Sequence, residues 1–292
     1  MPLNAKEIRR RIKGFASTRQ ITKAMEMVAA AKVRRAQARV TAARPYAEGI
    51  KGMFAAVTAQ VPAGDIEAKL LERREIKNVA VVVVTSDKGL SGAYNSNVLR
   101  AAVNRLREWR EKGIEPKLII IGTKGVSFFK HSNFEVLSRY TNLPQIPTFT
   151  EATVICEEIA KLYTDEAVDK VELVYTQFHS MLRYTPEVLD LLPATLPETG
   201  AVKSQQTDYI FEPSAGAMIE ELIPKYLETV VFQSLLESTT SQLASQMAAM
   251  SAATKNAGEM IDQLTIVLNK ARQGAITQEI LEVVGGAEAL NA

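Results

Sequence analysis

Two histidines are the residues best suited to acid–base chemistry in this chain of 292 residues. Neither His131 nor His179 has an acid or a nucleophile beside it at the spacing of a catalytic motif, so we expect both to be structural or surface residues. Phosphate-binding patterns of the Walker A and GxGxxG types are absent from the sequence. The sequence therefore predicts no catalytic residues, no metal ligands and no cofactor-binding residues.

Cys156 is the only cysteine, which limits the redox and metal chemistry open to the chain. A single cysteine cannot form an internal disulfide, and it argues against a cysteine-based metal cluster. We expect Cys156 to be a small buried apolar residue, and a reducing compartment is the simpler interpretation.

One segment has the composition of an anion-binding turn. Residues 85–94 (TSDKGLSGAY) follow an apolar run and precede a helical pattern, and backbone amides at such a turn can hold an anion. Gly89 and Gly92 also suit a tight strand-to-helix turn that binds nothing. The structural interpretation is favoured, because a third glycine and a following acidic residue are missing.

The N-terminal segment is strongly basic, although the net charge of the whole chain is only +2. Such a segment can bind nucleic acid, lie on an anionic membrane, face an acidic protein surface, or simply form the solvated side of a coiled coil. A long protein surface is favoured, because the basic residues are interleaved with small residues rather than aromatic ones. Up to residue 44 the basic residues are Lys6, Arg9, Arg10, Arg11, Lys13, Arg19, Lys23, Lys32, Arg34, Arg35, Arg39 and Arg44, against Glu7 and Glu26.

A long helix is expected to carry these charges. Apolar residues at Ile8, Ile12 and Phe15 are four and three residues apart, and Ile21, Met25 and Val28 repeat that spacing after a shift. Steps of this kind keep one stripe facing a partner helix. The helix should end before residues 61–64, where Pro62 and Gly64 form a breaker cluster.

The middle of the chain alternates between strand and helix patterns. Residues 79–84 are a continuous apolar run, typical of a strand that is buried on both faces. Alternation of strands and helices predicts a small, largely parallel, Rossmann-like sheet, although the segment from Leu191 to Gly200 is too irregular to assign. The expected elements are a helix over 95–112, a strand over 117–121, a helix over 151–165 and a strand over 171–178.

The C-terminal segment reads as a second long helix, in which Pro224 should introduce a kink or start the rigid part. Its apolar positions keep a 4–3 spacing typical of a coiled coil. The helices at the two ends of the chain are the natural partners for each other, and they must run antiparallel. The positions on the stripe are Leu243, Met247, Met250, Thr254, Ala257, Ile261, Leu264, Leu268, Ala271 and Ala275.

The predicted fold class is therefore α/β: a long antiparallel coiled coil of the N- and C-terminal helices plus a small central α/β domain. The domain limits drawn from the sequence are 1–60 for the first helix, 75–211 for the central domain, 213–285 for the second helix and 286–292 for a tail. No apolar run is long enough to cross a bilayer.

The end of the second helix carries apolar residues on more than one side. An apolar end is costly to expose to water, so Ile280, Leu281, Val283 and Val284 are expected to sit inside a partner. A self-packed or frayed end is the alternative.

Five segments of the sequence resemble the gamma subunits of F-type rotary ATP synthases of the bacterial type. Residues 21–32 (ITKAMEMVAAAK) resemble the N-terminal helix of that family, and residues 85–92 (TSDKGLSG) resemble its central-domain motif. Residues 269–273 (NKARQ), 276–282 (ITQEILE) and 285–288 (GGAE) are similar to its C-terminal signature. The resemblance thus extends over essentially the whole chain.

The resemblance implies a central-stalk rotor subunit that couples proton or other ion flow through a membrane rotor to ATP synthesis or hydrolysis, with no active site and no cofactor of its own. The implied partners are three alpha and three beta subunits of a catalytic ring, an epsilon subunit and the membrane rotor ring, with one copy of this chain per complex and no nucleic acid. The absence of a transit peptide favours a bacterial source, and the implied location is peripheral, at the cytoplasmic face of the bacterial inner membrane.

Particular residues acquire roles through the same resemblance. Met25 matches the position that packs against an acidic loop of a beta subunit, and Gln273 and Thr277 match C-terminal positions of the same rotor–stator contact. The apolar tip, Ile280, Leu281, Val283 and Val284, matches the part held in the upper bearing of the ring. Arg9, Arg10 and Arg11 are expected to meet acidic surfaces in the same contact.

The sequence departs from the family at one place, and two other functions stay open. Relatives often carry a basic residue at the position of Gln246 and an acidic one at that of Gln242, which puts the charged contact near Gln246 in doubt; Glu237 is the only charge between Thr229 and Thr254. The alternatives are a coiled-coil arm on a nucleotide-binding α/β enzyme that uses the turn at Gly89, and a basic coiled-coil protein that binds nucleic acid.

Overall fold

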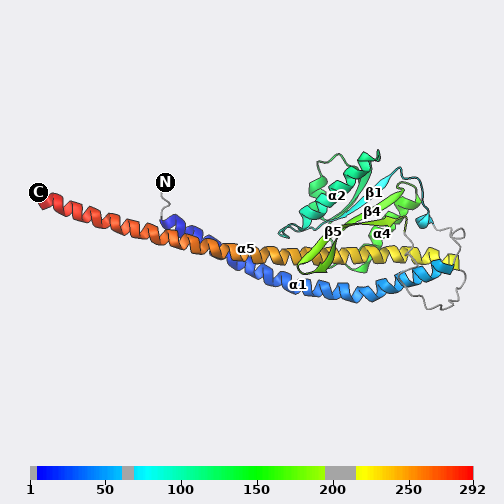
Figure 1. Ribbon diagram of the computed structural model, residues 1–292, viewed down its shortest axis with the longest axis horizontal. Coiled ribbons are helices and arrows are strands. Elements are labelled where there is room, and N and C mark those ends of the chain that lie inside the picture. The colour runs from blue at the N-terminus through cyan, green and yellow to red at the C-terminus, as the bar shows by residue number, and fades with distance from the viewer. Residues whose placement is uncertain (1–4, 61–68, 195–214, 292) are drawn as a thin grey trace. The chain divides into compact units, whose positions relative to one another are not determined.

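The structure is a computed structural model that describes residues 5–60, 69–194 and 215–291 (Figure 1). It contains two compact units. Residues 31–245 form the sheet unit, and residues 1–30 with residues 246–292 form the coiled-coil unit. The helices α1 (Ala5–Gln60) and α5 (Ala215–Asn291) each contribute to both units.

A five-stranded sheet is the centre of the sheet unit, with the strand order β3-β2-β1-β4-β5. The first four strands along the chain pair in parallel, and β5 is antiparallel to β4. The expected α/β class with a largely parallel sheet is therefore confirmed. The strands are β1 (Val79–Val84), β2 (Pro116–Ile121), β3 (Val136–Tyr140), β4 (Lys170–Ser180) and β5 (Arg183–Leu192).

Both faces of the sheet are covered, which explains why β1 is apolar at every position. Val79, Val81 and Val83 pack with α2 (Tyr94–Glu111) and α3 (Thr123–Phe129) on one face. The alternate residues of β1 belong to a second apolar cluster, which includes α4 (Phe149–Thr164) and the long helices. The sheet unit is thus a three-layer structure with helices on both sides.

Within the sheet unit the two long helices run antiparallel to each other. Phe54, near the end of α1, stacks on Tyr226, near the start of α5, with ring centroids 5.2 Å apart. Val33 and Ala36, earlier in α1, cluster with Leu243 and the residue that follows it in α5. Residue numbers that rise along one helix therefore fall along the other.

In the coiled-coil unit the two helices also run antiparallel to each other (Figure 1). The hydroxyl of Thr254 in α5 donates a hydrogen bond of 2.8 Å to the hydroxyl of Thr22 in α1. Between residues 259 and 286 the residues of intermediate burial are Ile261, Leu264, Leu268 and Ala271, and the others are more exposed. These four belong to the heptad stripe expected from the sequence, so the stripe on α5 is confirmed over this stretch.

The stripe on α1 differs from the expectation. Ile21 and Val28 are exposed at 58% and 53%, whereas Thr22 and Ala29 are buried. The predicted shift of the stripe at Ile21 is wrong, because Thr22 keeps the seven-residue spacing from Ile8 and pairs with Thr254 across the two helices. The large apolar side chains of this segment face outward instead.

Several elements were not foreseen. The elements α3, β3 and β5 had no assignment, and residues 195–200, part of the irregular segment, lie outside the described residues. Helix α5 begins at Ala215, so Pro224 lies inside it, and it continues to Asn291 through residues expected as a tail. In the described parts of the chain, none of the helices combines the length and apolar character needed to span a bilayer.

Candidate partner-binding surfaces

The arginine group at the start of α1 is on the outside of the coiled-coil unit. Arg9, Arg10 and Arg11 are all exposed, and they follow Ile8, which is fully buried. Arg11 pairs with Glu7 one turn earlier, at 2.9 Å. This local pair neutralises one of the three charges, and the group therefore still offers positive charge to a partner.

Apolar side chains accompany these charges on α1. Met25 is half-buried, and Ile21, Met27 and Val28 are exposed by more than half of their surface. Most of the exposed large apolar side chains among the described residues lie in the coiled-coil unit. A surface that combines positive charge with large aliphatic side chains suits a protein partner with acidic and apolar regions better than it suits nucleic acid.

The C-terminal candidate residues lie on a part of α5 where every side chain from Arg272 to Gly286 is exposed. Gln273 and Thr277 are one turn apart, and the Thr277 hydroxyl donates a hydrogen bond of 3.0 Å to the Gln273 carbonyl oxygen. No hydrogen bond or ion pair among residues 5–30 and 246–286 joins them to the arginine group. The structure thus places both sets on the surface of one unit.

The tip of α5 is apolar and uncovered. Ile280, Leu281, Val283 and Val284 are exposed at 57%, 63%, 71% and 56%. These residues point to more than one side of a single helix, as the sequence predicted, and an apolar surface of this kind is typical of an interaction site.

The motif at residues 85–94 is fastened within the sheet unit by its own polar side chains. The Thr85 hydroxyl donates to the Ile121 carbonyl oxygen at 2.8 Å and accepts from the Gly125 amide at 2.9 Å. Asn95 joins Ser86 and Ser91 through its side-chain amide. The side chains of Thr85, Ser86 and Ser91 therefore form hydrogen bonds within the turn and to its neighbours, which supports the structural interpretation of this motif.

Asp87 connects three segments of the sheet unit. Its carboxylate accepts hydrogen bonds of 2.8 and 2.6 Å from the amide and hydroxyl of Thr123, at the start of α3. Burial alone would raise the pKa of Asp87, but these bonds and those from the backbone of Asn142 and Leu143 hold it below its ordinary value. Asp87 is thus a stable anion that occupies the N-terminus of α3.

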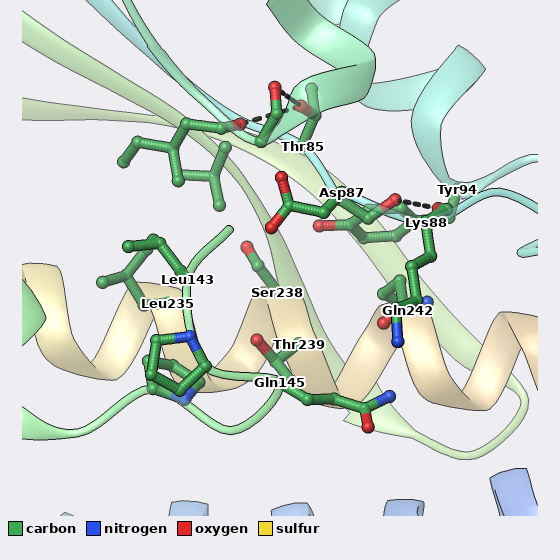
Figure 2. Close-up of a pocket in the computed structure, with 16 residues that line it drawn as sticks. Thr85, Asp87, Lys88, Tyr94, Leu143, Gln145, Leu235, Ser238, Thr239 and Gln242 are labelled. Carbon is green, nitrogen blue, oxygen red and sulfur yellow. Dashed lines mark hydrogen bonds between the residues drawn. The ribbon is translucent and has the colours of Figure 1, made fainter. Parts of the chain in front are cut away.

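A small cavity of about 160 Å³ lies beside this turn. Figure 2 shows Asp87, Tyr94 and Ser238 pointing toward the same space, with Gln145 on the opposite side. Burial raises the pKa of the Tyr94 phenol far above its ordinary value, so this group stays protonated. The lining offers hydrogen-bonding groups but no acid–base pair with shifted pKa values suited to catalysis near neutral pH.

The remaining chemical candidates are structural or isolated. His131 and His179 are exposed, and His179 lies 2.9 Å from the Thr185 hydroxyl. Cys156 is buried, and burial raises the pKa of its thiol. In the part of the chain that the structure describes, there is no cluster of three or more His, Cys, Asp or Glu side chains arranged to hold a metal ion.

A row of buried hydroxyl residues on α5 was missed at the sequence level. Ser234, Ser238, Ser241 and Ser245 are all buried in the sheet unit. The signal for it was present, because residues 230–253 hold a single charge, Glu237, and a long helix without charges is not made to face water.

A sheet unit packed on the two terminal helices, and a coiled-coil unit with an apolar and basic surface, define a subunit of a larger assembly. The family model described as ATP synthase matches residues 4–290. An ATP synthase gamma chain from Gloeothece citriformis is 43% identical, over 98% of this chain and 99% of that protein. One from Desulforamulus reducens is 44% identical, with the same coverage.

Solved structures share the fold. A chain of the Euglena gracilis mitochondrial ATP synthase (OSCP/F1/c-ring) superposes with a TM-score of 0.67 at 18% identity, covering 99% of this chain and 95% of that one. A central stalk/c-ring chain from Tetrahymena thermophila gives 0.59 at 24% identity, covering 80% and 99%. This protein belongs to the ATP synthase gamma chain family, and it is a rotor subunit of the F-type ATP synthase.

Proposed function

We propose that this chain is the non-catalytic central shaft of its complex and that the coiled-coil unit is the part that works against the catalytic ring. Its proposed partners are three alpha and three beta subunits, an epsilon subunit and the membrane rotor ring, with one copy of the chain per complex. The proposed location is the cytoplasmic face of a bacterial inner membrane. In the motif at residues 85–94, the side chains of Thr85, Ser86 and Asp87 form internal hydrogen bonds, which supports a non-catalytic role.

The observation that carries the proposal is the outward-facing surface of the coiled-coil unit. Ile21, Met27 and Val28 turn away from the partner helix, and the tip of α5 exposes four more large aliphatic residues. Leaving this much apolar surface in water is unfavourable, so this surface is expected to be covered by the surrounding subunits of the ring. The tip, Ile280, Leu281, Val283 and Val284, is the proposed bearing segment.

The basic residues have a different role in this proposal. An exposed ion pair contributes only about 0–1 kcal/mol, so pairs between Arg9, Arg10 or Arg11 and acidic loops bias the angle of the shaft without trapping it at one position. Met25, Gln273 and Thr277 are the other proposed rotor–stator contacts. Weak contacts repeated around the shaft permit rotation, whereas one deep apolar contact would hold it in place.

A charge-reversal experiment tests the electrostatic part. Arg9→Glu, Arg10→Glu and Arg11→Glu are combined in the reconstituted complex. ATP hydrolysis, ion transport and the affinity of the chain for the ring are then measured at low and at high salt. At about 0.5 kcal/mol per lost pair, the affinity of the chain for the ring should fall about tenfold, most visibly at low salt.

The matched control reverses three exposed charges on the sheet unit, Arg100→Glu, Arg107→Glu and Lys130→Glu. It changes the net charge equally but leaves the coiled-coil unit intact, so affinity for the ring and coupled hydrolysis should stay near the wild-type values. Equal behaviour of the two triple variants would refute a specific contact at the arginine group.

A further inference from the structure

The buried hydroxyl row on α5 has a regular spacing. Ser234, Ser238, Ser241 and Ser245 are four, three and four residues apart, which places them on one side of a helix. All four are at most 4% exposed. In the sheet unit, α5 therefore carries a polar stripe. This stripe is separate from the apolar residues of α5, such as Leu243, that pack against α1.

The stripe faces the part of β4 that extends beyond the end of its neighbour, β1. Strand β1 pairs with β4 only as far as Val174, while β4 continues to Ser180. Beyond that point, the Thr176 amide donates to the Ser238 hydroxyl oxygen at 3.1 Å, and the Ser241 hydroxyl donates to the Thr176 carbonyl oxygen at 3.4 Å. Side chains of α5 thus take the place of a strand along this edge of β4.

Two further contacts extend this arrangement. The Phe178 amide donates to the Glu237 carboxylate at 3.4 Å, so the one charge in this stretch of α5 also serves β4. The Ser245 hydroxyl donates to the Ser91 carbonyl oxygen at 2.6 Å. Ser91 belongs to the motif at residues 85–94, so this motif also forms a hydrogen bond with α5.

We propose that Glu237, Ser238, Ser241 and Ser245 form a torque clamp that fixes the rotational register of α5 in the sheet unit. The proposal rests on the proposed function of the chain as a shaft. They are positioning residues, which act by holding the helix rather than by touching a reacting group.

The physical basis is the difference between apolar and hydrogen-bonded contacts. The other contacts of α5 in the sheet unit are largely apolar, as with Ile223, Leu227 and Val231, and apolar attraction has no preferred direction. Turning an α-helix by one residue is a rotation of about 100°. Such a turn would leave the Thr176 amide buried without a partner and would remove one of the two hydrogen bonds that the Ser91 carbonyl oxygen accepts, the other coming from the Tyr94 amide at 3.1 Å. Both losses oppose slippage under load.

The test uses the whole complex in membrane vesicles. The clamp variant combines Ser238→Ala, Ser241→Ala and Ser245→Ala. The control combines Ser234→Ala and Thr240→Ala, which removes equally buried hydroxyls that bond only to the helix's own carbonyl oxygens, at 2.9 and 2.7 Å. Ions transported per ATP hydrolysed are measured against a rising opposing gradient, together with hydrogen exchange in residues 170–180.

If the proposal is correct, the clamp variant should transport fewer ions per ATP hydrolysed at a high opposing gradient while it still hydrolyses ATP. The control variant should keep the wild-type ratio. Exchange of the Thr176 amide should accelerate by roughly fivefold, the equivalent of one hydrogen bond. Restoring the hydroxyl with Ser238→Thr should recover part of the transport ratio. If the triple variant does not assemble, the single variants Ser238→Ala and Ser241→Ala give the same measurements.

Three results would overturn the clamp. These are an unchanged transport ratio in the assembled clamp variant, an equal loss in the control, and unchanged ratios in both single variants. The proposed function fails by a different result, namely vesicles that keep ATP-driven transport without this chain.

Discussion

Glu172 is a fully buried carboxylate in the sheet unit, and its replacement by glutamine tests how much its buried ion pair contributes to stability. Arg105 binds it through two nitrogens at 2.7 and 2.6 Å, and the Trp109 ring nitrogen donates to it at 2.9 Å. Lys170 lies 3.3 Å away. This cluster fastens α2 to the beginning of β4, the strand whose far end holds α5.

The expected cost follows from what Glu172→Gln leaves behind. Removing one partner of a buried ion pair costs about 3–5 kcal/mol. Arg105 keeps its contact with Glu108, and Lys170 keeps its contact with Asp190 at 2.9 Å, so the lower end of that range applies. With a urea m value of about 2 kcal/mol per M, the unfolding midpoint should fall by about 1.5 M.

Trp109 is the only tryptophan in the chain, so its fluorescence reports unfolding at the cluster, and circular dichroism gives a second probe. The matched control is Glu115→Gln, which removes an arginine-paired carboxylate whose side chain is 62% exposed. The control should leave the midpoint unchanged. If both variants unfold at the wild-type midpoint, the reasoning about buried charge is refuted.

The difference should also depend on pH. Burial alone would raise the pKa of Glu172, but Arg105 and Trp109 hold it below its ordinary value. A carboxyl whose folded pKa is lowered stabilises the protein above its unfolded pKa, about 4.3, and loses that contribution as the pH falls through the folded value. The stabilities of the wild type and Glu172→Gln should therefore begin to approach each other as the pH falls below the unfolded pKa, and they should converge only below the lowered folded pKa.

Three shorter predictions concern other positions. Gly122→Ala should destabilise the sheet unit by more than about 2 kcal/mol in urea titrations, because Gly122 has a φ of 94° and an added Cβ would lie 2.3 Å from a backbone oxygen. Gly113→Ala, with a φ of 79° and open space around it, should cost less. Replacing Thr22 and Thr254 together by valine should nearly preserve stability, because both hydroxyls of the pair disappear; a double-mutant cycle measures whether each single change costs more. Cys156 should resist thiol reagents until the protein unfolds, since burial raises its pKa; rapid labelling of the native chain would contradict its buried position.

The fold was largely predictable where one physical constraint acted alone. The run at β1 has to be buried on both faces, and the heptad on α5 has to meet another helix, so both were assigned correctly. The prediction for the stripe on α1 is wrong, because the spacing favours burial of two large apolar residues, Ile21 and Val28. They are exposed, and a chain that carries a surface for partners breaks the rule that large apolar residues lie inside.

The polar row on α5 shows a second limit of sequence reasoning. The scarcity of charge between Thr229 and Thr254, where Glu237 is the single charged residue, is visible in the sequence. Its cause lies in β4, whose extension beyond β1 depends on strand lengths that no local pattern encodes. β5 was missed for a related reason, since much of it is only partly buried and its alternation is weak. Contacts between segments distant in sequence decided both cases.

The uncovered end of α5 has a consequence for how the complex is made. Most of the stability of a helix in a protein comes from tertiary packing, and this end of α5 instead exposes aliphatic side chains at Ile280, Leu281, Val283 and Val284. A newly synthesised copy that is not yet assembled therefore exposes an apolar end that favours self-association or degradation. Biogenesis should favour early capture of this end by the ring, with free copies kept scarce in the cell.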